Sequence, residues 1–205
     1  MPKGIRGVSY SQQKQSEMKR IILASNSPRR QELLRGLDLN FTVEVHKGIK
    51  ESFPTDLPAD EVPLFIAREK AADYQVPDDA VLITADTVVI IDNEVLGKPK
   101  DEAEACRMLG RLSGRTHHVV TGVCLTTSDR QVAFSSKTNV TFRELSPAEI
   151  QYYVKTYKPF DKAGAYGIQE WIGHIGVISI NGSFFNVMGL PVARVYEELK
   201  KIGAI

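Results

Sequence analysis

The longest β-branched run of the chain is Val81–Ile91, and it contains a single charged residue, Asp86. A run of this length and composition predicts a strand in the core of a sheet rather than a surface strand. Asp92-Asn93 follows it directly and is predicted to form a turn. The fold is therefore expected to be organised around this strand, with Asp86 as an exception inside it.

Strand and helix signals alternate on either side of this run. Further strands are predicted at Arg20–Ser25, Phe41–Val45, Val119–Thr127 and Val132–Leu145. Helices are predicted at Leu57–Tyr74 and Pro191–Lys200, with others beginning after Ser27, at Asp101 and after Ser146. Asn181-Gly182, inside Ile178–Val187, predicts a β-hairpin. The pattern indicates a mixed α/β fold with antiparallel pairs, in one compact unit.

Composition supports a folded protein of this size. The 205 residues are 42% hydrophobic and 25% charged, which is ordinary for a globular chain. Residues 1–17 are rich in Gln, Ser and Lys and are expected to form a mobile N-terminal extension. Residues 18–205 are expected to form a single domain.

Charge and cysteine usage exclude several classes of protein. The 26 Lys and Arg residues nearly balance 25 Asp and Glu residues, which argues against a dedicated nucleic-acid binder. No apolar run approaches the ~20 residues that span a bilayer, so no membrane association is expected. Cys106 and Cys124 give neither a disulfide framework nor metal-binding spacing. We expect a cytoplasmic protein.

The first candidate site is the segment Ser25–Arg30, where a strand passes into a helix. The free N–H groups and dipole of a helix N-terminus favour an anion. Arg29 and Arg30 have the wrong charge for that dipole, which makes sense if they surround a bound phosphate. The alternative is two solvated arginines on a surface turn.

Asp86 is the second candidate. A buried lone carboxylate must be paired, metal-bound or catalytic, because burying an isolated charge costs several kcal/mol. It could bind Mg²⁺ or accept a proton from water. The structural alternative is an Asp at a strand end, in a bulge or a cap.

Three further segments could bring polar groups to the same place. Lys70 lies on a predicted, mostly apolar helix, although a solvated side chain is the more common role there. Lys98 precedes Pro99 and can fold back beside Asp86. The glycine-punctuated segment 161–169 ends in Gln169, which could read a base edge or a phosphate; the alternative is a flexible connector.

Other polar residues are expected to be structural. His117 and His118 are neighbours in a predicted strand, so their side chains point to opposite faces and cannot jointly hold one metal. The sequence has neither a P-loop nor a Gly-x-Ser-x-Gly motif, which argues against P-loop NTPases and α/β-hydrolases.

Five motifs, taken in order, resemble the Maf family of nucleoside triphosphate pyrophosphatases. They are Ser-Asn-Ser-Pro-Arg-Arg-Gln-Glu-Leu-Leu (25–34), Ala-Arg-Glu-Lys-Ala (67–71), Ala-Asp-Thr-Val-Val (85–89), Gly-Lys-Pro (97–99) and Leu-Ser-Gly-Arg-Thr-His (112–117). The resemblance runs from about Lys19 to the C-terminus. Asp-Lys-Ala-Gly-Ala-Tyr-Gly-Ile-Gln (161–169) and Asn-Val-Met-Gly-Leu-Pro (186–191) resemble the dTTP/UTP branch.

This resemblance implies a two-lobed α/β fold of the inosine-triphosphatase-like type, with the nucleotide in a central cleft. It implies cleavage between the α and β phosphates, a divalent cation such as Mg²⁺ or Mn²⁺, and a homodimer. Trp171 and His174 depart from the usual pattern after the glutamine and could reshape the rim of the cleft.

The same resemblance assigns roles to individual residues. Asp86 matches the general base, and Lys98 a cation that acts on the leaving group. Phosphate-handling positions match Ser25, Arg29, Arg30, Lys70 and Lys98. Positions linked to substrate choice match Arg29, Thr87 and Gln169. Glu51 matches an acidic position that would hold the metal together with Asp86.

Two alternative functions remain open from the sequence. One is a pyrophosphatase for 7-methyl-GTP or another non-canonical nucleotide. The other is a nucleotide-binding regulator of cell division in which hydrolysis is incidental. The intact pair of Asp86 and Lys98 argues against a pure binder, which has no need of a base and a leaving-group cation.

Overall fold

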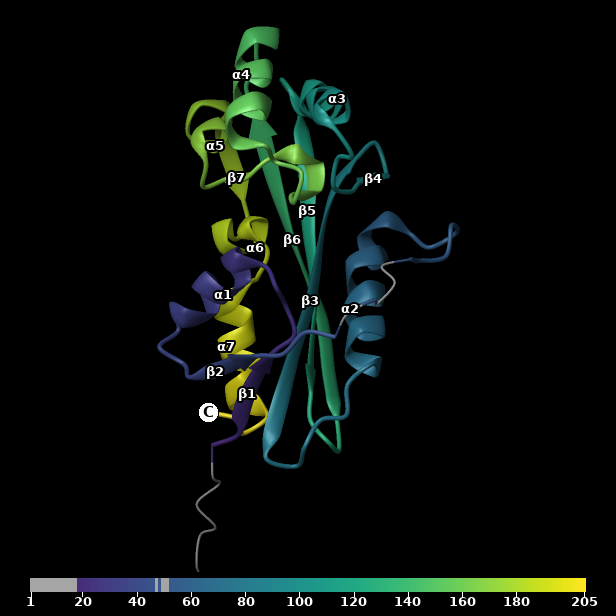
Figure 1. Ribbon diagram of the computed structural model, residues 1–205, viewed down its shortest axis with the longest axis vertical. Helices are drawn as coiled ribbons and strands as arrows, with labels where there is room; N and C mark the ends of the chain where they lie inside the picture. The colour runs from purple at the N-terminus through teal and green to yellow at the C-terminus, as the bar shows by residue number, and fades with distance from the viewer. Residues whose placement is uncertain (1–17, 47, 49–51) are drawn as a thin grey trace, which may run out of the picture.

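The computed structural model describes residues 18–46, 48 and 52–205. The expected N-terminal extension, residues 1–17, and the predicted metal ligand Glu51 lie outside these residues. The described chain is built on one mixed sheet with strand order β2-β1-β3-β5-β6-β7, and β4 pairs separately with β3 (Figure 1). None of the helices in this part of the chain has the length and apolar character that crossing a membrane requires.

The strands confirm the predicted mixed α/β class. They are β1 (Arg20–Leu23), β2 (Phe41–Val43), β3 (Ala80–Ile91), β4 (Glu94–Leu96), β5 (Thr116–Thr126), β6 (Gln131–Phe142) and β7 (Val177–Asn181). β1 runs parallel to β2 and to β3, and all the other described pairs are antiparallel. The turn predicted at Asp92-Asn93 is present, with a positive φ at both residues, and it leads into the short strand β4.

The helices begin largely where the capping signals place them. They are α1 (Pro28–Arg35), α2 (Val62–Ala72), α3 (Glu102–Leu112), α4 (Pro147–Tyr157), α5 (Trp171–Gly176), α6 (Phe184–Met188) and α7 (Val192–Lys201), with 3₁₀ turns η1 (Ala59–Glu61) and η2 (Ala163–Ala165). Ser146 and Glu149 form a complete capping box at α4. At α3, Asp101 caps the helix as predicted, but the Glu104 side chain accepts from the Lys100 N–H, so no complete capping box forms there.

The predicted hairpin around Asn181-Gly182 is wrong. β7 ends at Asn181, and Gly182 turns the chain with φ +131° into α6 rather than into a second strand. Ser183 caps α6, since its hydroxyl accepts from the Asn186 N–H. The Asn186 side chain in turn donates to the Val119 carbonyl and to the Thr138 hydroxyl, which fixes α6 against β5 and β6. Tertiary hydrogen bonds therefore override the local hairpin signal.

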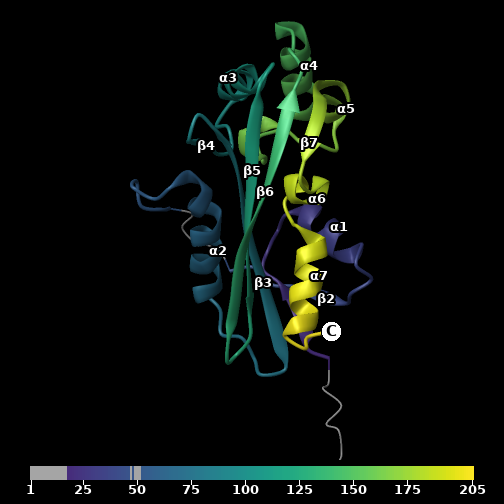
Figure 2. The same cartoon turned by 180° about the vertical axis from the view of Figure 1, so that it is seen from behind.

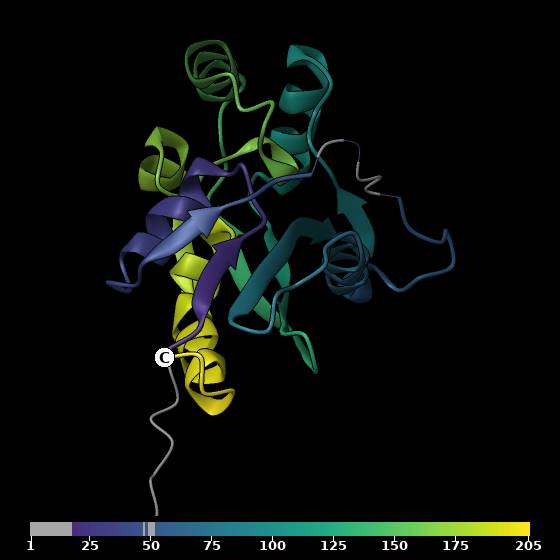
Figure 3. The ribbon, with the colours of Figure 1, turned by 60° about the horizontal axis from the view of Figure 1, so that its bottom comes forward.

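Helices cover both faces of the sheet, as Figures 1 and 2 show from opposite sides. In Figure 3, α2 lies on one side of the sheet and α7 on the other. One core cluster joins α1 and α7 to β1, β3 and β5, and a second joins α3, α4 and α5 to the other end of the sheet. These two clusters correspond to the two lobes that were expected.

The site is positioned by a gap in the pairing along one edge of β3. β1 pairs with β3 only as far as Ile83, and β4 pairs only from Val89 onward. Between these two points, no described strand pairs with that edge, and Asp86 and Thr87 lie there. On the other edge, Asp86 is directly opposite Gly122 of β5, without a register shift. The interpretation of Asp86 as a bulge or strand-end residue is therefore wrong.

Candidate active site

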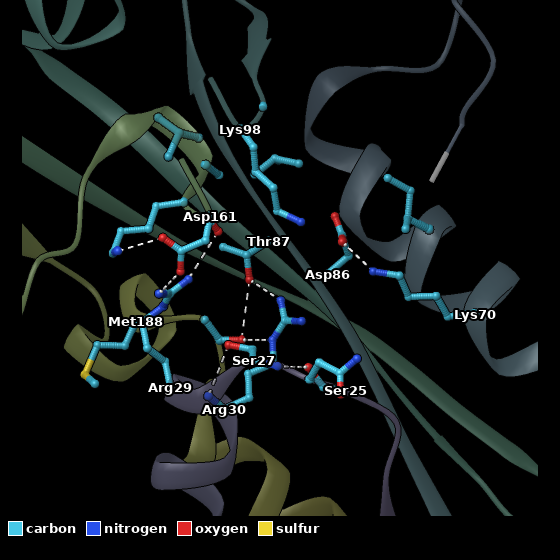
Figure 4. A pocket seen from close by; sticks show the side chains of 18 of the residues that line it. Ser25, Ser27, Arg29, Arg30, Lys70, Asp86, Thr87, Lys98, Asp161 and Met188 are labelled. Carbon is cyan, nitrogen blue, oxygen red and sulfur yellow. Dashed lines mark hydrogen bonds and ion pairs between the residues drawn. The ribbon is translucent and has the colours of Figure 1, made fainter. Parts of the chain in front are cut away.

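A cavity of about 640 Å³ opens at this gap in β3 (Figure 4). Its walls come from the β1–α1 loop, α2, β3, the segment after β4, the 161–169 loop and the end of α6. The predicted site residues that the structure describes all line it: Ser25, Arg29, Arg30, Lys70, Asp86, Thr87, Lys98 and Gln169. Segments far apart in sequence therefore meet at one place, as the combined motifs suggested.

Asp86 and Lys70 form a largely buried ion pair on the α2 side of the sheet. Lys70 Nζ donates to Asp86 Oδ1 at 2.8 Å, and the two side chains are only 13% and 14% exposed. Gly122 makes this approach possible, because a Cβ there would meet backbone atoms of α2 at 2.3–2.5 Å. Asp86 Oδ2 has no hydrogen-bond partner among the described residues and faces the cavity (Figure 4). Asp86 thus keeps one carboxylate oxygen for a ligand.

Thr87 points to the opposite face of β3 and belongs to a hydrogen-bond chain. Arg30 Nη2 donates to Thr87 Oγ1 at 2.9 Å, and Thr87 lies 2.9 Å from the hydroxyl of Thr121. The Thr121 hydroxyl can donate to the Asn186 carbonyl, and the Thr87 hydroxyl can donate to the Gly189 carbonyl at 3.4 Å. The Thr87 hydroxyl therefore helps to hold the Arg30 guanidinium in place.

Arg30 holds the two sides of this lobe together. Besides Thr87, its guanidinium donates to the carbonyls of Gly189 at 2.8 Å and Ala85 at 3.0 Å. At least three of its five N–H groups are thus used by described residues. Phosphate binding by Arg30 stays a prediction, and the structure adds a positioning role that the sequence did not indicate.

The β1–α1 loop is shaped by its own serines. Ser25 Oγ accepts from the Ser27 N–H at 3.2 Å, and Ser27 Oγ accepts from the Arg30 N–H at the start of α1. Ser25, Asn26 and Ser27 all line the cavity, so the N-terminus of α1 faces it. This arrangement is the anion-favouring geometry expected from the sequence.

Arg29 reaches across the cavity to the opposite lobe. Its Nη1 donates to Asp161 Oδ2 at 2.7 Å. Burial alone would raise the pKa of Asp161, but hydrogen bonds from Lys162 and Arg29 lower this pKa to about 2. Asp161 and Lys162 were not singled out from the sequence as site residues, although they open the glycine-rich motif.

Lys98 and Gln169 complete the cavity. The Lys98 side chain extends from the segment after β4 toward Asp86 (Figure 4), as predicted. The segment is fixed to the 161–169 loop, because the Gly164 N–H donates to the Gly97 carbonyl at 3.0 Å. Gln169 Oε1 is buried at the cavity wall and has no hydrogen-bond partner within the described part of the chain. An unpartnered buried acceptor of this kind is costly unless a ligand supplies a donor.

The charge of the cavity suits a polyanion. Its described lining includes five cationic side chains, Arg29, Arg30, Lys70, Lys98 and Lys162. The carboxylates among the same lining residues are Asp86 and Asp161. This excess is local, since the whole chain carries a formal charge of only +1. A triphosphate can therefore be bound without a basic surface.

The residues also fit a divalent cation that is shared with a substrate. The described part of the chain contains no group of three or more His, Cys, Asp or Glu side chains able to hold a metal by itself. Mg²⁺ is commonly bound by one or two carboxylates together with substrate phosphates. Asp86 Oδ2 provides one such ligand inside the cation-lined cavity, and this donor set suits an ion that arrives with a triphosphate.

This chain is similar to several known proteins. A solved HAM1 protein from Coxiella burnetii aligns with 90% of this chain and 100% of its own, at 16% identity and a TM-score of 0.48. The dTTP/UTP pyrophosphatase of Phocaeicola vulgatus is 59% identical over 188 residues, or 91% of this chain and 97% of that protein. The dTTP/UTP pyrophosphatase of Parabacteroides distasonis is 55% identical over 183 residues, or 88% and 95%. Residues 20–202 match the family described as Maf-like protein, so the chain belongs to the Maf family.

Proposed function

We propose that this protein is a nucleoside triphosphate pyrophosphatase that hydrolyses dTTP and UTP to the monophosphate and pyrophosphate. The observation that carries the reaction type is the buried Asp86, with one carboxylate oxygen facing a cavity lined by five cationic side chains. The substrate choice is supported by relatives at 59% and 55% identity that are named dTTP/UTP pyrophosphatases.

In the proposed reaction, water adds across the bond between the α and β phosphates. One lone pair of Asp86 Oδ2 accepts the proton of the attacking water and the other remains for a cation, while Lys70 holds Oδ1 and fixes the orientation of the carboxylate. Lys98 and Arg29 lie on the cavity wall, where they stabilise the negative charge that builds on the leaving pyrophosphate. Such cations stabilise phosphate charge most strongly where little water screens them.

We propose Mg²⁺ or Mn²⁺ as the cofactor, held by Asp86 and Glu51 together with the phosphates. When bound, such an ion neutralises phosphate charge and lowers the pKa of a bound water. The support is the donor chemistry of Asp86: the described residues offer no group of three metal ligands, which leaves phosphate oxygens to complete the coordination.

Gln169 supports the choice of base. Uracil and thymine carry an N3–H donor between two carbonyls, whereas the N3 of cytosine is an acceptor. The buried, unpartnered Gln169 Oε1 can accept from N3–H but would face a second acceptor in CTP. A site that leaves an acceptor unpaired with the wrong base discriminates strongly against it.

The test is a product analysis of the purified protein with Mg²⁺ and separate samples of dTTP, UTP, CTP, dATP, GTP and 7-methyl-GTP. Monophosphate and pyrophosphate formed from dTTP and UTP, with little of the others consumed, is the expected result. Diphosphate and phosphate would place the cleavage at the wrong bond. Preferred hydrolysis of 7-methyl-GTP would favour the alternative pyrophosphatase, and binding without product would favour the regulator.

We also propose that the protein acts in the cytoplasm as a homodimer. Its two cysteines are free thiols, as is usual in a reducing compartment. β7 is the edge strand of the sheet, with Ile178 66% and Ile180 37% exposed, and Phe185 on neighbouring α6 is 47% exposed. An exposed apolar strand edge is a common pairing surface. Sedimentation equilibrium at micromolar concentration would give the mass of one chain if this proposal is wrong.

A further inference from the structure

A hydrogen-bonded network lies behind Gln169, in the wall of the cavity. The Tyr153 hydroxyl, on α4, accepts from the Gly167 N–H at 3.0 Å and donates to Glu170 Oε2. Lys162 Nζ lies 3.1 Å from Glu170 Oε1. The network therefore holds the chain at Gly167 and at Glu170, on both sides of Gln169.

The same network continues to the other lobe. Lys162 Nζ also donates to Asp161 Oδ1 at 2.8 Å, and Asp161 Oδ2 accepts from Arg29 of α1. One line of contacts thus runs from Tyr153 in α4, through the loop, to the opposite wall of the cavity. Within the described residues it contacts neither Asp86 nor Lys98, and it meets the groups assigned to the chemical step only at Arg29.

Burial makes this network stiff. The Tyr153 side chain is fully buried, and the side chains of Lys162 and Glu170 are only 9% and 21% exposed. A buried pair of this kind has few alternative partners, so its members keep one arrangement. The loop needs such support, because Gly164 and Ala165 both adopt positive φ. Glycine adopts this conformation readily, but alanine does so only when surrounding contacts hold it there.

We propose that Tyr153, Glu170 and Lys162 are positioning residues that set the base preference of the cavity by fixing Gln169. The inference rests on the proposed function, since it assumes that Gln169 Oε1 accepts from the N3–H of uracil or thymine. Reading that proton requires the amide to be held within a fraction of an ångström. Tyr153 and Glu170 act through Gln169 and are not expected to contact the reacting phosphates, whereas Lys162 also lines the cavity.

The test compares UTP with CTP in Tyr153→Phe. This change removes the hydroxyl that ties Gly167 to Glu170 but keeps the buried ring. We expect kcat/KM for UTP to fall about tenfold, mostly through KM, while kcat/KM for CTP changes little. The ratio of kcat/KM for UTP to kcat/KM for CTP should therefore fall about tenfold. Loss of stability alone would not change this ratio, because a smaller folded fraction lowers both values equally.

Tyr157→Phe is the matched control. Tyr157 stacks on Tyr153 with ring centroids 5.0 Å apart, and its hydroxyl has no hydrogen-bond partner among the described residues. Its removal should leave the UTP/CTP ratio unchanged. Glu170→Gln, which keeps the shape of the side chain but removes its charge, should change the ratio in the same direction as Tyr153→Phe. If Tyr153→Phe fails to fold, Glu170→Gln provides the same test.

The outcomes separate the inference from the proposed function. A wild-type protein that prefers UTP, with an unchanged ratio in both Tyr153→Phe and Glu170→Gln, overturns the inference alone. A lower melting temperature with an unchanged ratio would make the network a scaffold only. A wild-type protein that cleaves UTP and CTP equally, or cleaves neither, overturns the proposed base selection or activity together with the inference.

Discussion

At the scale of single residues, the site depends on the alternation of side chains along β3. Asp86 faces α2 and pairs with Lys70, while its neighbour Thr87 faces α1 and bonds Arg30. Successive side chains of a strand point to opposite faces, so two adjacent residues serve two walls of one cavity. This is possible only because the edge of β3 has no described strand partner at that point.

The first prediction concerns Asp86. Asp86→Asn keeps the size of the side chain but removes the oxygen that accepts a proton. A positioned general base contributes about 10²–10⁴-fold, so kcat for dTTP and UTP should fall by at least about 100-fold. KM should change by only a few-fold, because the cations that bind the phosphates remain. Steady-state kinetics and circular dichroism would measure these effects.

Asp78→Asn is the control for this substitution. Asp78 is an exposed residue in the turn before β3, away from the cavity. Near-wild-type turnover in Asp86→Asn would remove Asp86 from the mechanism. An equal loss of activity in both variants would point to a general effect on the protein.

At the scale of elements, the ion pair depends on how closely α2 packs on the sheet. Gly122 of β5 lies opposite Asp86, and its missing side chain lets the α2 backbone at Pro63 and Leu64 approach the strand. Thr84 adds a hydrogen bond of 2.7 Å to the Ala67 carbonyl of the same helix. These contacts fix the helix that carries Lys70.

The second prediction is that Gly122→Ala will move α2 away from the sheet. Overpacking of this kind costs about 1–3 kcal/mol, so the free energy of unfolding in urea should fall by that amount. Activity should fall as well, because Lys70 moves relative to Asp86. In Gly110→Ala, where a Cβ meets nothing within 4 Å on the helix α3, stability should instead rise by about 0.5–1 kcal/mol. Unchanged stability in Gly122→Ala would contradict the close packing.

At the scale of the whole molecule, a buried histidine links stability to pH. His117 is 1% exposed, lies 2.7 Å from the Tyr166 hydroxyl, and packs edge-on against Phe142. Burial, with a smaller contribution from neighbouring His118, lowers the pKa of His117 to about 4. The folded protein therefore keeps this ring neutral where an unfolded chain would protonate it.

The third prediction follows from this pKa. Between pH 6.5 and pH 4 the unfolded chain binds a proton that the folded chain does not, so stability falls as pH falls. His117 should contribute a loss of about 2 kcal/mol between pH 7 and pH 5. Urea unfolding at both pH values should show a smaller loss in His117→Gln than in the wild type. His118→Gln should keep most of the wild-type pH dependence, because burial is the larger cause of the lowered His117 pKa. An unchanged slope in His117→Gln would refute the assignment.

Local signals in the sequence determined most elements of this protein. The β-branched run predicted β3, and Ser-Pro pairs predicted the starts of α1 and α4, because a cap and a fixed proline φ act within a few residues. The ordered motifs determined the family and the residues that line the cavity. These properties depend on residue type and spacing, which the chain carries without its fold.

Only the tertiary structure decided how those residues work together. The hairpin signal at Asn181-Gly182 failed because Asn186 bonds β5 and β6. The ion pair of Lys70 with Asp86 joins segments that are distant in sequence. The gap along β3 and the unpartnered Gln169 Oε1 likewise result from how distant segments pack. Such contacts depend on where elements pack and which groups lose water, and no local pattern of residues encodes that.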